Sequence, residues 1–287
     1  MLSYLEQIEL KRFATQIRIQ TIYEIMARGS GHIGGSMSIC DMLAVLYGKV
    51  MRIDPSDPQK RHRDRFICSK GHAGPAVYAT LALKGYFPLD MLKTLNRLGT
   101  HLPSHCDMNM TPGIDMTTGS LGQGLSVAAG LALGNRIDHV DDDTFVVMGD
   151  GECQEGQIWE AAMTAAQYKL SHLIAFIDYN KLQINGPVNT VNDITNFCER
   201  FKSFHWNAEM VDGHNVDAIY SAICRAQAQN EAPSLIVLDT IKGYGCKYAL
   251  EHSPRNHSIP LPEDKMQESL DLLKQELAEY ERVLKEA

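Results

Sequence analysis

Three carboxylates gather where a run of apolar residues stops. In "VVMGDGECQEG", residues 146–156, the run ends in a Gly-Asp-Gly turn centred on Asp150, and Glu152 and Glu155 follow. The apolar run is typical of a buried β-strand, and the glycines let the backbone come close to a ligand. The helix predicted next, over 155–169, would offer backbone N–H groups to an anion. This stretch therefore predicts a site for ionic groups at the tip of a strand.

A second oxygen ligand lies one strand further along the chain. The segment "HLIAFID" (172–178) reads as the next strand, and Asn180 follows its end, thirty residues after Asp150. One helical crossover fills this gap, as two neighbouring parallel strands require, so both side chains should emerge at the same edge of a sheet. Carboxylate and amide oxygens suit Mg²⁺ or Ca²⁺ rather than Zn²⁺. A plain Asp-Gly turn is the alternative, but the strand–turn–helix setting and the strand-ending Asn favour a metal.

Four of the eleven histidines lie in loops of unusual composition. His32 lies in "SGHIGG", His72 in "SKGHAG", His105 in "LPSHCD" and His257 in "RNHSIPLPED". A single loop histidine is usually just exposed. Four of them in an α/β chain with an ionic site indicate proton transfer and hydroxyl recognition near neutral pH.

Apolar strands that alternate with helices must position these residues. The predicted strands span 65–69, 144–148, 172–178, 207–211 and 234–240. The predicted helices span 4–28, 38–50, 74–85, 88–98, 121–137, 155–169 and 215–230, and 99–120 forms a long irregular stretch. This order predicts an α/β fold with a doubly wound, mainly parallel sheet and helices on both of its faces. The loop of 99–120 is long enough to be functional.

The chain reads as one α/β domain, residues 1–262, followed by an amphipathic C-terminal helix, residues 263–287. The apolar residues of this helix follow a heptad seam: Met266, Leu270, Leu273, Leu277, Tyr280 and Leu284. Such a seam packs either on its own domain or on another chain.

Composition narrows the classes of function. The formal net charge is −8, which argues against nucleic acid or an anionic membrane as a partner. The basic cluster Arg61–Arg65 is interrupted by Asp64 and reads as a solvated surface. No 18-residue apolar span or signal peptide is visible, and no Cys-x-x-Cys occurs among the seven cysteines. These features predict a cytoplasmic protein with free thiols and no membrane segment.

Several of these stretches together resemble a known family. The Gly-Asp-Gly turn with its Asn thirty residues on is similar to the fingerprint of thiamine diphosphate enzymes. The resemblance to the N-terminal half of transketolase runs almost end to end. Its motifs are "SGHIGG", "DRFICSKGHAGPAVYATLALKGY", "TTGSLGQGLSVAAGLALG", "GDGECQEG", "LIAFIDYNKLQINGP" and "TIKGYG". The resemblance implies the thiamine diphosphate-binding fold and transfer of a two-carbon ketol unit from a ketose to an aldose.

The resemblance also implies how the metal and the diphosphate are held. Asp150, Asn180 and the backbone carbonyl of Leu182 would hold Mg²⁺, a place that Ca²⁺ or Mn²⁺ can also take, against the cofactor's diphosphate. Gly151 would contact the diphosphate, and His72 would lie beside it. In this interpretation the carboxylates at the strand tip hold the metal and one end of the cofactor.

Further roles follow from the same resemblance. His32 and His257 would serve substrate binding and proton transfer, with His257 also near the cofactor, and His105 would contact the ketol hydroxyls. Gly119, Ser120 and Leu121 would touch the aminopyrimidine and thiazolium rings. Glu155 matches a glutamate at the subunit interface.

Two residues depart from the usual pattern of the family. Ile33 stands where most members have Pro, and Ser120 stands where many have Pro within Gly-Pro-Leu. Both departures are features of bacterial half-length transketolases and of deoxyxylulose-phosphate synthases. They leave the fold prediction intact and weaken any inference about the substrate.

A larger departure is what the chain lacks. A full transketolase carries a second α/β domain, which binds the aminopyrimidine ring and supplies the glutamate that protonates it. The resemblance therefore implies a partner, a C-terminal transketolase subunit with the pyrimidine-binding domain, in an α2β2 assembly. The sugar would be phosphorylated by default, and a sulfonated or branched sugar is equally compatible.

Other functions remain open at this point. The chain could be half of a deoxyxylulose-phosphate synthase-like enzyme or of a 2-oxo acid decarboxylating enzyme, although "NHSIPLPED" speaks against both. It could also be a non-catalytic diphosphate-binding module, which the intact Asp150, Asn180 and histidines disfavour. A plain dinucleotide-binding dehydrogenase is disfavoured because no Gly-x-Gly-x-x-Gly opens a βαβ unit.

Overall fold

A five-stranded parallel sheet forms the centre of the computed structural model, which describes residues 1–184 and 186–287. Its strand order is β2 (Arg65–Cys68), β3 (Thr144–Gly149), β4 (Leu173–Tyr179), β8 (Ser234–Asp239) and β7 (Asn207–Asp212). All four pairings are parallel, so the five carboxyl ends lie along one edge. All five predicted strands are present, within one or two residues of the predicted bounds.

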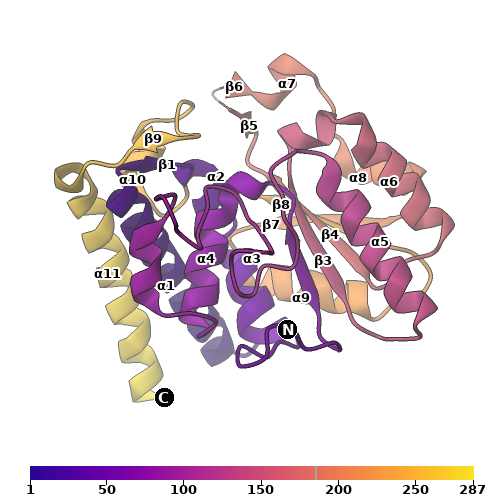
Figure 1. Ribbon diagram of the computed structural model, residues 1–287, viewed down its shortest axis with the longest axis horizontal. Coiled ribbons are helices and arrows are strands. Elements are labelled where there is room, and N and C mark those ends of the chain that lie inside the picture. The colour runs from indigo at the N-terminus through magenta and orange to yellow at the C-terminus, as the bar shows by residue number, and fades with distance from the viewer. Residues whose placement is uncertain (185) are drawn as a thin grey trace.

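Alternate side chains of the strands feed two separate apolar cores. On β3, Phe145 and Val147 belong to one core, whereas Val146 and Met148 belong to the other. The first core is covered by α1 (Tyr4–Arg28), α2 (Ile33–Met37), α3 (Cys40–Val45), α4 (Gly74–Leu83) and α9 (Val216–Gln227). The second is covered by α5 (Gln123–Ile137), α6 (Gly156–Gln167) and α8 (Phe197–Ser203). Figure 1 shows α5, α6 and α8 on one side of the sheet and α1 to α4 on the other, which confirms the predicted doubly wound fold.

Short elements connect these layers. They are the two-residue strands β1 (Ser30–Gly31), β5 (Leu182–Gln183), β6 (Gly186–Pro187) and β9 (Ile259–Pro260), and the helical turns η2 (Gly71–Ala73), η4 (Gly151–Gln154), α7 (Val188–Val191) and α10 (Lys247–Glu251). Strand β1 pairs antiparallel with β9 and thereby joins the start of the chain to its last loop.

The helix predicted over 38–50 begins earlier and is broken. Helix α2 starts at Ile33, α3 follows, and a π-helix, η1 (Leu46–Val50), ends the run. We expected "GSGHIGGSMS" to be a loop because of its glycines. Its first part instead contains β1, and Ile33–Met37 form α2, where the glycines allow close packing: a Cβ on Gly34 would lie 2.4 Å from the backbone oxygen of Asn256.

The helix predicted over 88–98 is wrong. Only a 3₁₀ segment, η3 (Leu89–Thr94), forms there. Asn96 then adopts a left-handed φ of 51°, and its N–H donates to the carbonyl of Leu102 at 2.8 Å. This turn sends the chain into 99–120, which contains no helix or strand, as predicted.

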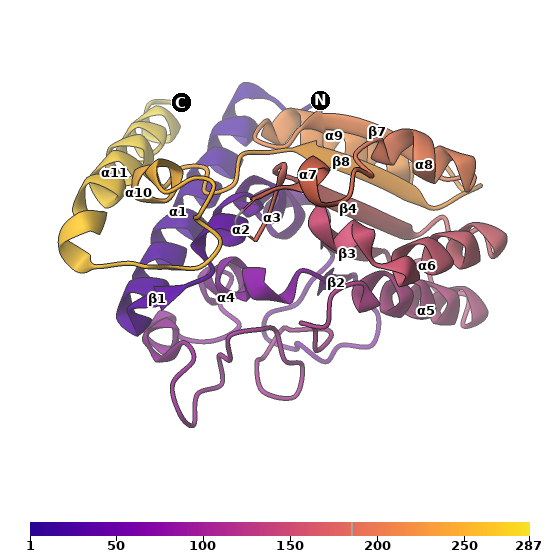
Figure 2. The same ribbon diagram turned by 90° about the horizontal axis from the view of Figure 1, so that it is seen from above.

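The C-terminal helix α11 (Glu263–Glu286) lies along α1 (Figure 2). Met266, Leu270 and Leu273, the first half of the heptad seam, are buried in the first core, whereas Leu272 is exposed. Of the two arrangements that the sequence allows for the seam, packing on the chain's own domain is therefore the one that the structure shows for this half. A helix long and apolar enough to cross a membrane is absent from residues 1–184 and 186–287.

Candidate functional site

The carboxyl ends of β3 and β4 place Asp150 and Asn180 together, as predicted. Gly149 pairs with Asp178 across the two strands, and the N–H of Asp150 donates to the carbonyl of Asp178 at 3.3 Å. The carboxylate of Asp150 turns toward the end of β4, where its Oδ2 accepts from the backbone N–H of Lys181 at 2.6 Å. Its Oδ1 accepts from the N–H of Gly151 at 2.8 Å. Only 2% of Asp150 is exposed.

Asp150 is a buried carboxyl group in need of a cation. Burial, together with the neighbouring Asp178, raises the pKa of Asp150 to about 7, although the N–H groups of Gly151 and Lys181 act in the opposite direction. A divalent cation beside the group would offset both causes and keep the carboxylate ionised.

The predicted metal ligands present a set of three oxygens. Asn180 Oδ1 lies beside the N–H of Leu182 at 3.1 Å, so the two residues form one tight turn next to Asp150. The carbonyl of Leu182 accepts from the ammonium of Lys242 at 3.3 Å. One carboxylate, one amide oxygen and one carbonyl suit a hard cation such as Mg²⁺. The described residues contain no cluster of three or more His, Cys, Asp or Glu side chains that could hold a metal.

Two buried lysines, which we did not predict as site residues, lie beside these oxygens. Lys70 and Lys242 are 1% and 3% exposed. Burial, then the nearby Lys70, lowers the pKa of Lys242 to about 8, against the attraction of Asp150 and Asp178. Both lysines stand in the quoted motifs "SKGH" and "TIKGYG", and a lysine among glycines just past a strand end was the signal that could have found them. Lys70 forms an ion pair with Asp178, so of the two it is Lys242 whose charge can bind an anion such as a diphosphate.

Glu152 does not join Asp150, contrary to our expectation for the carboxylates at this strand tip. Its Oε1 accepts from the N–H of Gly122 at 2.9 Å and from the hydroxyl of Ser69, and its Oε2 accepts from the N–H of Gly149 at 2.9 Å. Its carboxylate therefore ties the end of β3 to the start of α5. Glu155 is exposed. Of the three carboxylates, Asp150 is therefore the one that belongs to the set of three oxygens.

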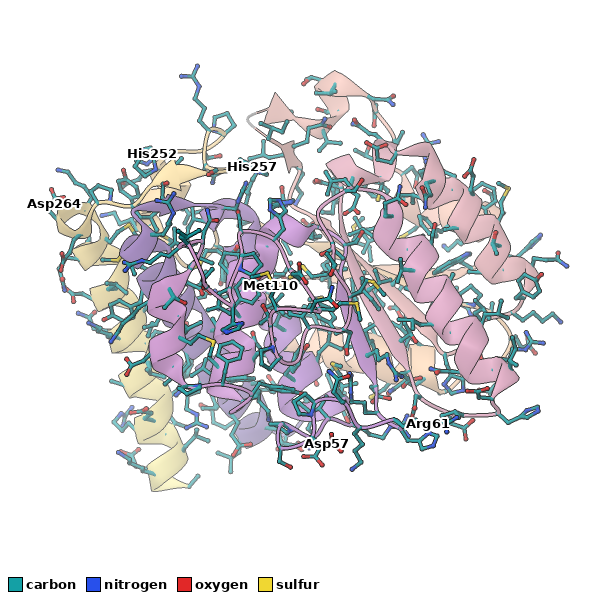
Figure 3. The ribbon with its side chains drawn as sticks, in the orientation of Figure 1. Asp57, Arg61, Met110, His252, His257 and Asp264 are labelled. Carbon is teal, nitrogen blue, oxygen red and sulfur yellow. The ribbon has the colours of Figure 1, made fainter. Side chains whose placement is uncertain are left out.

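The four predicted histidines lie together. The ring centroid of His32 is 5.6 Å from that of His72, 5.5 Å from His105 and 5.2 Å from His257. The rings of His72 and His257 are 4.9 Å apart. Pairing of β1 with β9 accounts for part of this cluster, because His32 directly follows β1 and His257 shortly precedes β9. In Figure 3, His257 lies in the upper part of the view, and Arg61, of the solvated basic cluster, lies at the bottom.

The histidines share an environment that disfavours their charged form. Burial is the first cause that lowers the pKa of His32, His72, His105 and His257. The pKa of His257 falls to about 3, with Lys242 as the second cause, and that of His72 falls well below its ordinary value. Neutral imidazoles at pH 7 can accept protons and bind hydroxyl groups.

The segment Gly119–Leu121 borders the histidine cluster. Gly119 has a φ of 139°, and a Cβ on it would lie 3.2 Å from the ring of His105. Ser120, Leu121 and the nearby Glu155 are exposed. Gly151 packs so closely on Gln183 that a Cβ would lie 2.5 Å from the Cβ of that side chain. The segment predicted to touch the cofactor rings thus forms an open rim of the site.

A cavity of about 150 Å³ opens beside His32. Its polar lining comes from α1, β1 and the loops that follow: Arg28, Ser30, Asn96, Ser104 and Ser258. Hydroxyl, amide and guanidinium groups around a small cavity suit a polar, oxygen-rich ligand.

Comparison with known proteins identifies the family to which the chain is related. The model of the thiamine diphosphate binding domain of transketolase matches residues 10–278. The chain is 51% identical, over 90% of its length and 94% of the relative's, to the 6-deoxy-6-sulfo-D-fructose transketolase subunit SqwG of Clostridium sp. (strain MSTE9). It is 37% identical, over 90% of its length and 92% of the relative's, to one of the subunits of the apulose-4-phosphate transketolase of Phocaeicola vulgatus.

Solved structures agree with the sequence relatives. Transketolase from Campylobacter jejuni matches with a TM-score of 0.83 and 26% identity, over 98% of this chain and 48% of that protein. Transketolase from Leishmania mexicana matches with a TM-score of 0.82 and 26% identity, over 99% of this chain and 46% of that protein. The chain thus spans about half of these transketolases but nearly all of the two subunits. It belongs to the transketolase family of thiamine diphosphate-dependent transferases and carries the family's thiamine diphosphate-binding domain.

Proposed function

We propose that this chain is the N-terminal subunit of a two-chain transketolase that moves a two-carbon ketol unit from a ketose to an aldose. The observation that carries the proposal is one continuous site, in which Lys242 links the oxygen set of Asp150, Asn180 and Leu182 to a cluster of four histidines. The ammonium of Lys242 donates to the carbonyl of Leu182 at 3.3 Å, and its charge lowers the pKa of His257. Relatives of nearly the same length that are named as transketolase subunits support the two-chain arrangement.

The oxygen set would hold Mg²⁺, and the diphosphate of thiamine diphosphate would lie between the metal, Gly151, His72 and Lys242. Gly119, Ser120 and Leu121 would line the cofactor's rings. When bound, thiamine diphosphate supplies the electron sink for breaking and forming the carbon–carbon bond. The buried Asp150 and Asn180 fit this role because their oxygens are fixed by the backbone around them.

The histidines would handle the substrate's protons. His32 and His257, with neutral rings, would accept and return protons at the sugar, and His105 would bind the ketol hydroxyls. His257 would also lie against the cofactor. General acid–base groups contribute about 10²–10⁴-fold in rate, so loss of either proton-transfer residue should cost that order.

A partner subunit would complete the site from the open rim. Ser120, Leu121 and Glu155 are exposed next to the cluster, where the partner's pyrimidine-binding domain would cover them in an α2β2 assembly. The two relatives carry a sulfo-sugar and a sugar phosphate in their names, so we propose a sugar with an anionic end group as substrate. All seven cysteines are free, which suits the reducing cytoplasm, where we place the enzyme.

The test is reconstitution. The chain is purified alone and with the candidate partner, and ketol transfer is assayed with thiamine diphosphate, Mg²⁺ and sugars that carry a phosphate or a sulfonate. We expect activity from the mixture, none from the lone chain, and loss of metal-dependent cofactor binding in Asp150→Ala. Full activity of the lone chain, with no partner detected by mass spectrometry, would overturn the two-chain proposal.

A further inference from the structure

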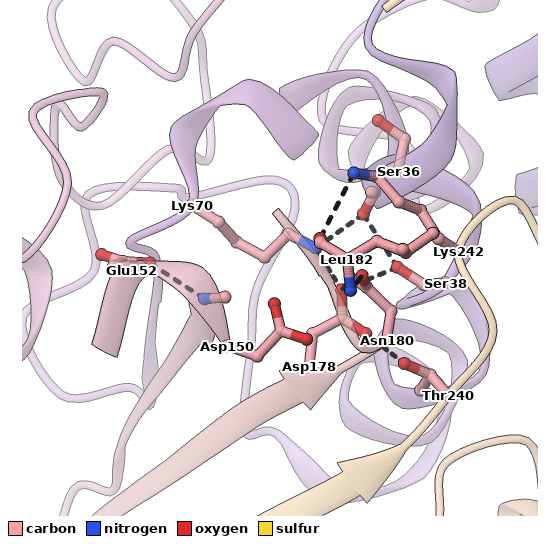
Figure 4. Close-up of polar contacts among 12 residues, drawn as sticks. Ser36, Ser38, Lys70, Asp150, Glu152, Asp178, Asn180, Leu182, Thr240 and Lys242 are labelled. Carbon is pink, nitrogen blue, oxygen red and sulfur yellow. Dashed lines mark hydrogen bonds and ion pairs between the residues drawn. The ribbon is translucent and has the colours of Figure 1, made fainter. Parts of the chain in front are cut away.

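Asp178 is a fully buried carboxylate, 0% exposed, that the proposed chemistry does not use. It accepts four hydrogen bonds, from residues that Figure 4 labels. Oδ2 accepts from the hydroxyl of Ser38 at 2.7 Å, from the amide of Asn180 at 2.8 Å and from the ammonium of Lys70, and Oδ1 accepts from the hydroxyl of Thr240. This number of donors satisfies a carboxylate fully.

The four donors come from different parts of the fold. Lys70 follows β2, Asn180 follows β4 and Thr240 follows β8, so one carboxylate joins the ends of three parallel strands. Ser38 follows α2 on the covering layer. All four donors are 7% exposed or less, so water does not compete strongly for these contacts.

The contact with Asn180 decides which atom this residue offers to a metal. Its Nδ2 donates to Asp178, so its Oδ1 points the other way and keeps a lone pair beside its contact with the N–H of Leu182. A rotated amide would turn an N–H₂ group toward the metal and an oxygen against the carboxylate of Asp178. Asp178 therefore fixes the ligand oxygen before a metal arrives, as partners of ligating groups do at metal sites.

The same carboxylate is coupled to the histidine cluster through Lys70. The ammonium of Lys70 also donates to the carbonyl of Gly35 in α2 at 2.8 Å. Helix α2 begins directly after His32, and a Cβ on Gly35 would lie 3.3 Å from Nε2 of His72. The position of α2, and with it of His32, therefore depends on the pair formed by Lys70 and Asp178.

We infer that Asp178 is a positioning residue with two effects. It orients the Asn180 oxygen for the divalent metal, and it fixes the position of α2, and of His32 before it, relative to the metal site. This inference rests on the proposed function. Stability alone does not account for the arrangement, because replacing a buried ion pair by apolar side chains is often neutral or stabilising.

The test separates positioning from folding by removing both charges at once. In the double variant Lys70→Met/Asp178→Leu no unpaired charge stays buried, whereas Asp178→Leu alone would leave the ammonium of Lys70 without its partner. Ser38→Ala is the matched control, because it removes one donor to Asp178 and leaves the contact with Asn180. Asp150→Ala removes a proposed metal ligand outright.

Mn²⁺ binding is measured by electron paramagnetic resonance on the full chain with its partner and thiamine diphosphate, beside thermal unfolding of each variant. We expect the double variant to unfold within a few degrees of the wild type and to bind Mn²⁺ about 10–100-fold more weakly. Ser38→Ala should bind Mn²⁺ like the wild type.

Wild-type Mn²⁺ affinity in a folded double variant would overturn the inference and leave the proposed function intact. Equal weakening in Ser38→Ala would also overturn it, because the effect would then not follow the contact with Asn180. If the wild type and Asp150→Ala bound Mn²⁺ equally, the metal site itself, and with it both proposals, would be wrong.

Discussion

Replacing Glu152 by Gln should loosen the start of α5 without changing the shape of the side chain. In the wild type, both carboxylate oxygens accept hydrogen bonds from donors: the N–H groups of Gly122 and Gly149, each at 2.9 Å, and the hydroxyl of Ser69. A glutamine has one accepting oxygen. In either orientation of its amide, one of the two backbone N–H groups faces an N–H₂ group and loses its acceptor.

The magnitude follows from the burial of the group. Glu152 is 3% exposed, so water cannot replace the lost acceptor. A buried donor without a partner costs about 1–3 kcal/mol. A value of about 2 kcal/mol lowers the thermal midpoint of a 287-residue chain by about 3 °C. Because 1.4 kcal/mol is a factor of ten, local opening at the affected amide should become about 30-fold more frequent.

The assay combines thermal unfolding with hydrogen exchange of the Gly122 and Gly149 amides. Glu199→Gln is the control, because Glu199 is an exposed partner of Lys202 at 3.1 Å and such surface pairs contribute about 0–1 kcal/mol. We expect the midpoint and the protection of one of the two amides to fall in Glu152→Gln only. An unchanged midpoint together with unchanged protection of both amides would refute the role given to Glu152.

Three further predictions concern the helix seam, the rim and the histidines. Leu270→Ala in the buried seam of α11 should cost about 2–5 kcal/mol in urea unfolding and the exposed Leu272→Ala far less; equal costs would contradict the packing of α11 on α1. Gly122→Ala should destabilise the lone chain, because Gly122 has a φ of 86° and a Cβ on it would lie 2.7 Å from the side chain of Glu155. Gly134→Ala, whose Cβ would have no atom within 4 Å, should be neutral or stabilising. Burial, then a nearby lysine, lowers the pKa of His257 to about 3, so the stability that its neutral ring contributes should be present above about pH 6.5 and lost as the pH falls toward 3. His257→Asn should flatten this pH dependence of the free energy of unfolding, measured in urea. An unchanged pH profile in the variant would contradict the prediction.

Local patterns predicted the frame of the site. Apolar strands ending in Gly-Asp-Gly and in Asp-Tyr-Asn were enough to place Asp150 beside Asn180, because parallel neighbours share a carboxyl edge. The failures occurred where tertiary contacts override local propensity. Glycines read as loop formers lie within α2, because Asn256 and Lys242 approach the backbone there.

The hidden part of the site consists of buried polar partners. Nothing in the sequence shows that Glu152 turns away from Asp150, since the direction of a side chain after a strand depends on which donors the fold supplies. Likewise, Asp178 reads as an ordinary strand residue, and only the meeting of three strand ends with the end of α2 reveals its four donors. The partners of these side chains depend on which distant segments of the chain pack together, and the hydrophobic periodicity of the sequence does not predict that packing.

The charges of the site lead to a last prediction, that metal and cofactor strengthen each other's binding. Asp150 and Asp178 face Lys70 and Lys242 in a region with little water. The pKa of Asp150 is raised to about 7 and that of Lys242 is lowered to about 8, so burial disfavours the charge of both groups. A cation alone would favour ionised Asp150 but repel Lys242, and a diphosphate alone would do the reverse.

Binding both together favours both charges, so the coupling should be positive and, by linkage, reciprocal, with a typical size of about 5–150-fold. Thiamine diphosphate affinity of the assembled enzyme, measured by calorimetry with Mg²⁺ and with a chelator, gives this factor directly. In Lys242→Met the factor should change, because the repulsion between the lysine and the metal is gone, whereas Lys49→Met at an exposed surface pair should leave it unaltered. Equal cofactor affinity with and without Mg²⁺ in the wild type would refute the predicted coupling between metal binding and cofactor binding.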